Sequence, residues 1–219
     1  MDYFEKSLSN INRGGHWDMI VIDGVVGVGK TTLMNIMAAE KGYRCFEEPV
    51  VDNPILEKFY YDRERYSFSL QIFFLNKRFK HIKEAAKEEN AVMDRSIYGD
   101  VIFAKMLNDA GEMCSEEFDL YSELFENMIE HCKAPKLLVY LETSVDSAMD
   151  KINKRGRDYE KIVEREYWEK LNFNYRAYFE QYNISPILKI NVDGLDFENN
   201  EKDKEYVLEL IDEALRGIK

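Results

Sequence analysis

The chain has 219 residues, of which 45% are hydrophobic and 13% aromatic, and its formal net charge is −12. This length and composition predict one globular domain with a sizeable core. The acidic balance argues against a nucleic-acid polymer or an anionic membrane surface as a partner, because both require a basic face. The apolar runs are far shorter than a membrane span, and the start "MDYFEKSLSN" lacks the profile of a secretion signal.

The number and spacing of the cysteines indicate the cellular compartment of the protein. Cys45, Cys114 and Cys132 are odd in number, widely separated and without C-x-x-C spacing. This pattern favours reduced thiols in a cytoplasmic protein.

Apolar runs alternate with helical patterns along the chain. Residues 1–17 are polar and rich in turn-forming residues, so we expect an N-terminal extension followed by a single domain at 18–219. The expected strands are 19–23, 43–46, 91–93, 136–141 and 187–192. The expected helices are 31–41, 54–61, 67–89, 100–109, 115–131, 145–155, 161–182 and 201–217. This alternation predicts an α/β fold with a five-stranded parallel sheet flanked by helices, whose ligands lie beyond the carboxyl ends of the strands.

A glycine-rich stretch, "GVVGVGKTT", follows the first expected strand and opens a helix. It fits the P-loop pattern G-x-x-x-x-G-K-[ST]. In that geometry, backbone N–H groups and the helix dipole meet a polyphosphate, the lysine reaches the outer phosphates and the threonine hydroxyl binds Mg²⁺. A purely structural glycine turn is the alternative, and the strand-turn-helix context disfavours it. The expected phosphate-binding residues here are Gly24, Gly27, Gly29, Lys30, Thr31 and Thr32.

Charged residues follow the second and third expected strands. The stretch "FEEPV" offers Glu47 and Glu48, and Glu48, which precedes a proline, is the better candidate for a base that accepts a hydroxyl proton. The stretch "MDRS" places Asp94 where a P-loop protein needs a carboxylate near Mg²⁺, and Arg95 where it stabilises a transferring phosphoryl group. A surface carboxylate and a surface ion pair are the alternatives.

The stretch "KINKRGRD" holds the one dense basic group in this acidic sequence, namely Lys151, Lys154, Arg155 and Arg157. A solvated helix end is one interpretation, because cations are favourable there. A glycine between two arginines also permits a mobile flap that closes over phosphates and excludes water. With a P-loop present, we favour a basic LID segment at about 151–160.

The helical stretch "YSFSLQIFFLNKRFKHI" is apolar along much of its length, yet Gln71 and Arg78 lie on one face of it, two turns apart. Phe74 and Leu75 share this face. Polar groups within such a stripe predict a pocket wall, although Arg78 could instead extend to solvent.

Taken together, these motifs resemble the deoxyribonucleoside kinase family, and within it the shorter bacterial deoxyadenosine/deoxyguanosine kinases. The resemblance runs from residue 19 to about 195. It implies the P-loop kinase fold and transfer of a phosphoryl group from ATP, with Mg²⁺, to the 5′-hydroxyl of a deoxyribonucleoside in nucleotide salvage. The matching stretches are "GVVGVGKTT", "EEPVVDNP", "FYYDRERYSFSLQIFFLNKRF", "DRSIYGDVIFAKM" and "KRGRDYEKIVEREYW".

The same resemblance implies roles for single residues around the sugar and the reacting atoms. Glu48 would be the base for the 5′-hydroxyl, Arg95 would assist it, and Asp94 would belong to the Mg²⁺ environment. Tyr60 and Glu160 match positions at the 3′-hydroxyl of the sugar.

Further matches concern the nucleobase and the donor. Gln71, Arg78 and Asp100 match positions that read the base, Arg157 would hold phosphates, and Arg155 would pack against the donor adenine. Since Arg78 offers only donors and an ionised Asp100 only acceptors, a base with an exocyclic amino group fits this pair best. Deoxyadenosine is therefore our first choice of acceptor, and deoxyguanosine and deoxycytidine stay open.

Two positions depart from the animal members of the family. Asn53 stands where those members have an aromatic residue. The segment from Asp100 to Phe103 is one residue shorter, which shifts Phe103 by one position from the place of a base-stacking residue. The bacterial subgroup shares both features.

Other functions compete with this interpretation. A thymidylate kinase has the same fold but usually places arginine before its Glu-Pro pair and glycines after it, where this chain has "FEEPV". A non-catalytic nucleotide-binding subunit is disfavoured by Lys30, Glu48 and Arg95, and a small GTPase by the lack of an N-K-x-D motif.

Residues 115–131 form a helix whose apolar surface is wider than one stripe needs. Family members pair through helices at this place in the chain, so the resemblance implies a homodimer; a deeply buried core helix is the alternative. The apolar residues are Phe118, Leu120, Tyr121, Leu124, Phe125, Met128 and Ile129.

Overall fold

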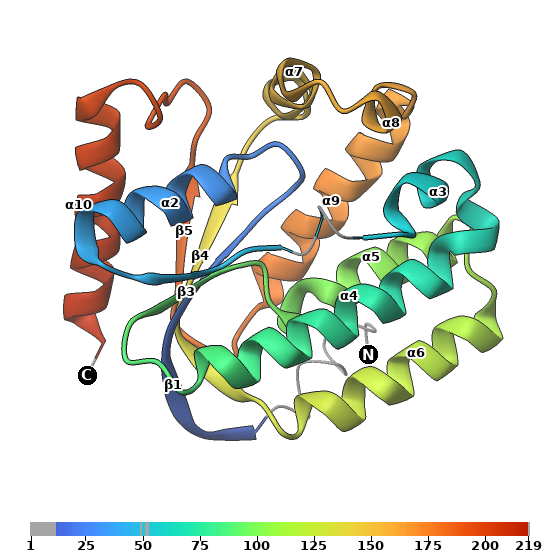
Figure 1. Ribbon diagram of the computed structural model, residues 1–219, viewed down its shortest axis with the longest axis horizontal. Coiled ribbons are helices and arrows are strands. Elements are labelled where there is room, and N and C mark those ends of the chain that lie inside the picture. Colours follow the sequence, from blue (N-terminus) through green and yellow to red (C-terminus); the bar gives the residue numbers. More distant parts are fainter. Residues whose placement is uncertain (1–11, 49, 51–52, 219) are drawn as a thin grey trace.

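The protein is described from a computed structural model that covers residues 12–48, 50 and 53–218. Five strands of this part form one sheet in the order β2-β3-β1-β4-β5, and every neighbouring pair is parallel. Figure 1 shows the sheet with helices around it. The strands are β1 (Asn12–Asp23), β2 (Arg44–Phe46), β3 (Ala91–Asp94), β4 (Lys133–Glu142) and β5 (Ile187–Asn191). The expected five-stranded parallel sheet is confirmed.

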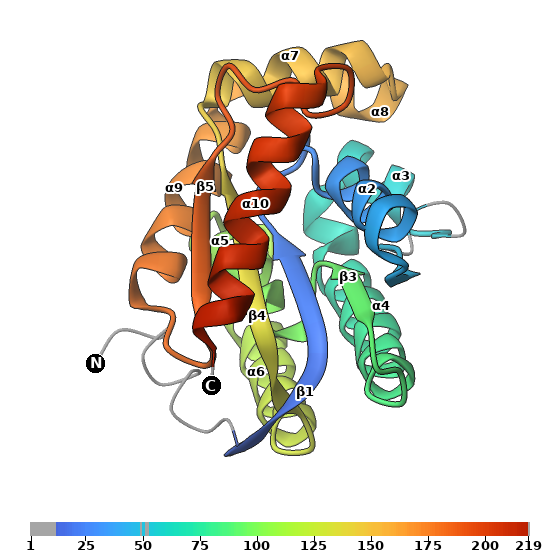
Figure 2. The ribbon, with the colours of Figure 1, turned by 90° about the vertical axis from the view of Figure 1, so that its left-hand side faces the viewer.

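Helices cover both faces of the sheet (Figures 1 and 2). Helices α2 and α10 share one face, where the Lys41 ammonium lies 2.5 Å from the Asp212 carboxylate. Helices α4, α5 and α9 cover the other face, and α6 packs outside α4 and α5. The helical segments are α2 (Lys30–Lys41), α3 (Leu56–Tyr61), α4 (Arg63–Ala85), the short 3₁₀ turn η1 (Ile97–Gly99), α5 (Asp100–Asp109), α6 (Ser115–Ile129), α7 (Val145–Arg155), α8 (Asp158–Lys161), α9 (Arg165–Gln181) and α10 (Glu201–Gly217).

The core is built on the central strand. Ile20 of β1 lies opposite Val92 of β3 and Leu137 of β4, and all three side chains are buried. Strands that are buried on both faces read as continuous apolar runs, which explains why short stretches such as "MIVID" predicted them. Within the described residues, no helix is both long and apolar enough to cross a lipid bilayer.

Strand β1 begins at Asn12, ahead of the expected start at residue 19. The early part pairs with β4, where Asn12 lies opposite Lys133 and Trp17 opposite Pro135. Local sequence did not predict it, because two glycines in "NRGGHW" favour a turn and the stabilising partner is far away in the chain. The expected boundary at residue 17 therefore falls inside β1, and residues 1–11 lie outside the described part.

Several helix boundaries also differ from expectation. Helix α4 begins at Arg63 instead of residue 67, because the Asp62 side chain accepts a hydrogen bond from the Arg65 backbone N–H and caps it, and it ends at Ala85 instead of residue 89. In place of the expected helix 161–182, α9 begins at Arg165, after Glu164 in an extended conformation, and the short helix α8 precedes it.

Candidate active site

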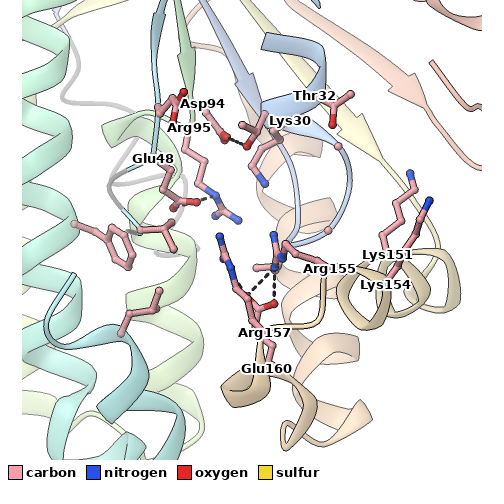
Figure 3. A pocket seen from close by; sticks show the side chains of 18 of the residues that line it. Lys30, Thr32, Glu48, Asp94, Arg95, Lys151, Lys154, Arg155, Arg157 and Glu160 are labelled. Carbon is pink, nitrogen blue, oxygen red and sulfur yellow. Dashed lines mark hydrogen bonds and ion pairs between the residues drawn. The ribbon is translucent and has the colours of Figure 1, made fainter. Parts of the chain in front are cut away.

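The carboxyl ends of β1, β2 and β3 open into a cavity of about 770 Å³, which we call the active-site cavity. Figure 3 shows Glu48 and Arg95 facing each other in it, with Lys30 beside them and two LID arginines gathered at Glu160. The expected site residues that line the cavity are Gly27, Gly29, Lys30, Thr31, Thr32, Glu48, Tyr60, Gln71, Arg78, Asp94, Arg95, Arg155, Arg157 and Glu160. Gly24 and Asp100 were also expected at the site, and neither contributes to the lining.

The glycines of the P-loop let the backbone pass close to other elements. Gly27 has φ 81°, and a Cβ atom there would lie 2.7 Å from the Ala148 carbonyl oxygen of α7. Gly29 has φ 112°, and its Cβ would lie 2.8 Å from the Phe197 ring. Both the left-handed backbone and the lack of space require glycine. The loop therefore packs directly against α7, the helix that leads into the LID.

Lys30 is the first residue of α2 and is only 6% exposed. Its ammonium donates to the carbonyl oxygens of Gly24, at 3.1 Å, and Val25, at 2.9 Å. Burial and the nearby Arg95 guanidinium lower the pKa of Lys30 to about 8, although neighbouring carboxylates oppose that shift. The Lys30 ammonium therefore lies at the P-loop, where an incoming phosphate can replace the two carbonyl oxygens as its partner.

Thr31 and Asp94 meet at the ends of α2 and β3. The Thr31 hydroxyl donates to Asp94 Oδ2, whereas Asp94 Oδ1 is buried and has no hydrogen-bond partner among the described residues. Burial raises the pKa of Asp94. A hydroxyl and a carboxylate are oxygen ligands of the kind that Mg²⁺ prefers, and Mg²⁺ usually takes few protein ligands together with substrate phosphates. These two residues therefore fit the expected cation. No group of three or more His, Cys, Asp or Glu side chains in the described residues is placed to hold a metal by itself.

Glu48 follows β2 and is held by two arginines. Its Oε1 atom lies 2.5 Å from Nη2 of Arg78 and 3.4 Å from Nε of Arg95. Burial alone would raise the pKa of Glu48, but the charges of Arg95, Arg78 and Lys30 lower it to about 2. The carboxylate is thus ionised and fixed in direction beside the P-loop lysine.

Arg95 is held from several sides. It is the one described non-glycine residue with a positive φ, at 64°, and its backbone N–H donates to the Ile22 carbonyl oxygen at 2.9 Å. Its guanidinium donates to the Tyr175 hydroxyl and lies 5.0 Å from the centre of the Phe103 ring. Residues held in this sparsely populated conformation concentrate at functional sites. Sequence reasoning did not find Tyr175, because it lies on α9, 80 positions along the chain.

Arg78 connects two carboxylates in the wall formed by α4. Besides Glu48, it donates to Asp100 at the start of α5, and both Arg78 and Asp100 are only 3% exposed. Burial raises the pKa of Asp100 to about 7, against the opposing charge of Arg78. Asp100 lies outside the cavity lining and pairs with Arg78, which stands between it and the cavity. Gln71 and Arg78 form the polar part of the wall itself.

The LID joins the end of α7 to α8. Both Glu160 oxygens accept hydrogen bonds from Nη2 of Arg155, at 2.7 and 2.6 Å, and Arg157 lies 3.3 Å from Glu160 Oε1. Glu160 is 3% exposed, whereas Arg155 and Arg157 are each about one third exposed. Lys151 donates to the Val28 carbonyl oxygen of the P-loop at 3.4 Å. The LID arginines therefore rest on a carboxylate inside the cavity (Figure 3).

The segment 195–199, which sequence reasoning did not single out, also lines the cavity. Its Phe197 ring closes over Gly29. The segment follows β5, so the rule that ligands lie beyond the carboxyl ends of parallel strands could have found it. Tyr167 of α9 is a second lining residue that was missed.

A P-loop at the end of a parallel strand, an ionised carboxylate beside the P-loop lysine, and arginines around a cavity of about 770 Å³ define a P-loop phosphotransferase for a small acceptor. Comparison with known proteins narrows this class. The family model described as Deoxynucleoside kinase matches residues 20–216. The chain belongs to the deoxynucleoside kinase family, and it is a phosphotransferase of that kind.

Several relatives are similar over almost the whole chain. A deoxyadenosine kinase of Lactobacillus acidophilus is 41% identical over 209 residues, which cover 91% of this chain and 97% of the relative. A deoxyadenosine/deoxycytidine kinase of Bacillus subtilis is 40% identical over 197 residues, covering 88% and 91%. The structure of a deoxyadenosine kinase from M. mycoides with the products dCMP and a flexible dCDP superimposes with a TM-score of 0.81 at 31% identity, covering 89% of this chain and 99% of that one. The expected P-loop kinase fold and family are confirmed.

Proposed function

We propose that this kinase transfers the γ-phosphoryl group of ATP to the 5′-hydroxyl of a deoxyribonucleoside, giving the 5′-monophosphate for nucleotide salvage in the cytoplasm. The observation that carries the proposal is the position of Glu48. It is ionised and lies in the active-site cavity, together with the P-loop lysine and two buried arginines. A neutral hydroxyl acceptor needs such a base, whereas the phosphate of a nucleoside monophosphate would be repelled by it.

In this mechanism Glu48 accepts the proton of the 5′-hydroxyl while that oxygen bonds to the γ-phosphorus and ADP leaves. Lys30 and the loop N–H groups hold the donor phosphates. Thr31 and Asp94 would hold Mg²⁺, which neutralises developing charge on the phosphates. Arg95, fixed by Tyr175, would stabilise the transferring group.

The LID would complete the site when the donor binds. Arg155 and Arg157 now neutralise Glu160, and phosphate oxygens of ATP would compete for both guanidinium groups. We propose that Arg157 then holds phosphates and that Arg155 packs against the donor adenine. Glu160 is thereby freed to accept the sugar 3′-hydroxyl together with Tyr60.

The nucleobase would lie against the wall of α4 that Gln71, Phe74 and Arg78 form together. Asp100 would act mainly by holding Arg78 through Oδ1. Its other carboxylate oxygen, Oδ2, would accept a hydrogen bond from the exocyclic amino group of a base that reaches Asp100. Relatives named for deoxyadenosine, deoxyguanosine and deoxycytidine support an amino-bearing base. We propose deoxyadenosine first, with deoxyguanosine and deoxycytidine as the other candidates.

One experiment separates the proposal from its rivals. We would measure kcat/KM with radiolabelled ATP for the four deoxynucleosides and for dTMP, in parallel with Glu48→Gln as the inactive control. Deoxyadenosine as best acceptor and thymidine at least about tenfold weaker would support the proposal, because a missing polar partner in a buried site costs on the order of 2 kcal/mol. dTMP as best acceptor would establish a thymidylate kinase, and ATP binding without turnover of any acceptor would establish a non-catalytic subunit.

We also propose that the protein is a homodimer that pairs through α6. One side of this helix packs into the molecule through Phe118, Tyr121, Phe125 and Ile129. The other side carries Leu120, which is 55% exposed, next to the partly buried Leu124 and Met128. Helix α6 lies on the outside of the molecule, beside α4 (Figure 1). Its strip of Leu120, Leu124 and Met128 supports pairing better than the alternative of a fully buried helix.

A further inference from the structure

Tyr159 belongs to the four-residue helix α8 of the LID, and its ring stacks on Tyr60 of α3. The ring centres are 5.3 Å apart and the planes are inclined by 21°. Tyr60 lines the active-site cavity, whereas Tyr159 is not part of the lining. Tyr159 therefore contacts Tyr60 from outside the cavity and has no place from which to touch a ligand directly.

Packing alone orients the Tyr60 ring. Its hydroxyl makes no hydrogen bond to any other residue in the described part of the chain, and its other ring neighbour, Phe59, meets it edge-on at 5.2 Å. Rotation about the Cα–Cβ bond is what moves the hydroxyl oxygen of a tyrosine, and the flat contact with Tyr159 restricts that rotation for Tyr60 and so fixes where its hydroxyl lies. Burial and the nearby Tyr167 and Glu160 raise the pKa of Tyr60, so its hydroxyl remains a hydrogen-bond donor.

The same contact joins the LID to the sugar end of the cavity. A helix as short as α8 has little stability of its own, and it is held by the ion pairs of Glu160 and by the Tyr159 ring. Glu160 is the next residue after Tyr159, so the LID brings the carboxylate and the ring to Tyr60 as one unit. The binding of any ligand group that hydrogen-bonds to both Tyr60 and Glu160 therefore depends on the position of α8.

We propose that Tyr159 is a positioning residue that determines specificity for the sugar 3′-hydroxyl, acting through the ring of Tyr60. The inference rests on the proposed function, in which Tyr60 and Glu160 receive that hydroxyl. Under this proposal, a residue outside the cavity helps the kinase to select sugars that carry a 3′-hydroxyl over 3′-deoxy sugars. Only the ring of Tyr159 is required, because the contact is a stack.

The test compares two acceptors that differ by one atom, deoxyadenosine and 2′,3′-dideoxyadenosine. For Tyr159→Ala we expect kcat/KM for deoxyadenosine to fall about 2- to 12-fold, which is the range set by the loss of one aromatic pair. For the dideoxy compound we expect kcat/KM to stay within about 1.5-fold of the parent value, because it has no 3′-hydroxyl for Tyr60 to meet. A general loss of LID structure lowers kcat/KM for both acceptors by the same factor, so it cancels in the ratio of the two kcat/KM values.

Two controls accompany this variant. Tyr159→Phe keeps the ring and should match the parent. Tyr61→Ala removes the neighbouring aromatic residue of α3, which is 63% exposed and makes no ring stack in the described residues, and it should leave the ratio unchanged. Binding of both nucleosides is measured by calorimetry as well, so that slow turnover of the dideoxy compound does not prevent the comparison. Tyr159→Leu, which keeps apolar packing, replaces the alanine variant if that variant unfolds.

The outcomes are distinct. An equal loss for both nucleosides overturns the proposal and makes Tyr159 a structural residue of the LID. No loss for either nucleoside overturns it as well. A parent protein that binds deoxyadenosine but does not phosphorylate it refutes the proposed function, and the ratio of the two binding constants still decides the role of Tyr159.

Discussion

Binding of ATP should draw a proton onto Lys30 when the pH is at or above 8. In the ligand-free protein, burial and Arg95 hold the pKa of this lysine at about 8. The phosphates of ATP would bring several negative charges next to the ammonium, which favours the charged form and returns the pKa toward its ordinary value of about 10.4. The complex then binds more protons than the free protein between these two values.

The number of protons taken up follows from the pKa of Lys30 in the ligand-free protein. At pH 8 about half of the free lysines are neutral and at pH 9 about nine tenths, so ATP binding should take up about 0.5 and about 0.9 proton respectively. At pH 6.5 the uptake from Lys30 should be close to zero. Because proton uptake accompanies binding, the affinity for ATP should fall as pH rises, by about fivefold between pH 8 and pH 9.

The assay is calorimetric titration with a non-hydrolysable ATP analogue and Mg²⁺ at pH 8 and pH 9, each in two buffers of different ionisation enthalpy. The difference in apparent enthalpy between the buffers measures the protons taken up. Lys30→Arg is the matched control, because arginine stays charged throughout this range and should show no such uptake. An uptake below about 0.1 proton at pH 9 in the parent, or the same uptake in the control, would refute the reasoning.

Three further predictions concern single residues. Glu48→Gln should lower kcat by about two to four orders of magnitude and leave the affinity for the nucleoside nearly unchanged; a kcat within threefold of the parent would exclude Glu48 as the base. Gly27→Ala should destabilise the fold by about 1–3 kcal/mol and weaken ATP binding, since it adds strain at φ 81° and a 2.7 Å approach to the Ala148 carbonyl oxygen; an unchanged melting temperature would contradict this. Leu120→Glu should convert a dimer of twice 25.9 kDa into a monomer in light scattering, and a parent that is already monomeric would refute pairing.

The strands and the P-loop were predictable because their signals are local. Short stretches rich in apolar residues predicted all five strands, although β1 begins earlier than expected, and the spacing of "GVVGVGKTT" is typical of a P-loop. The rule that parallel strands end at one edge of the sheet placed Glu48, Asp94 and Arg95 around one cavity before any contact was known. Their chemical roles stay predictions.

Other features depend on contacts between distant segments. The early start of β1 depends on pairing with β4, and the left-handed conformation of Arg95 accompanies a hydrogen bond to Tyr175 on α9. Asp100 could be recognised as a charged residue near the site, but its place behind Arg78, outside the lining, could not be predicted. The same holds for the stack between Tyr60 and Tyr159, two residues of different helices.

Sequence patterns alone predicted that Glu48, Asp94 and Arg95 follow strand ends and that Lys30 belongs to the P-loop. How the charged groups pair depends on the tertiary structure: Arg78 with both Glu48 and Asp100, Arg155 with Glu160. The physical reason is that a charge removed from water must find its partner within a few ångströms, and packing of the whole chain sets those distances. The pKa values of Lys30, Glu48 and Asp100 depend on the same burial and neighbours, and therefore so does the chemistry that the site can perform.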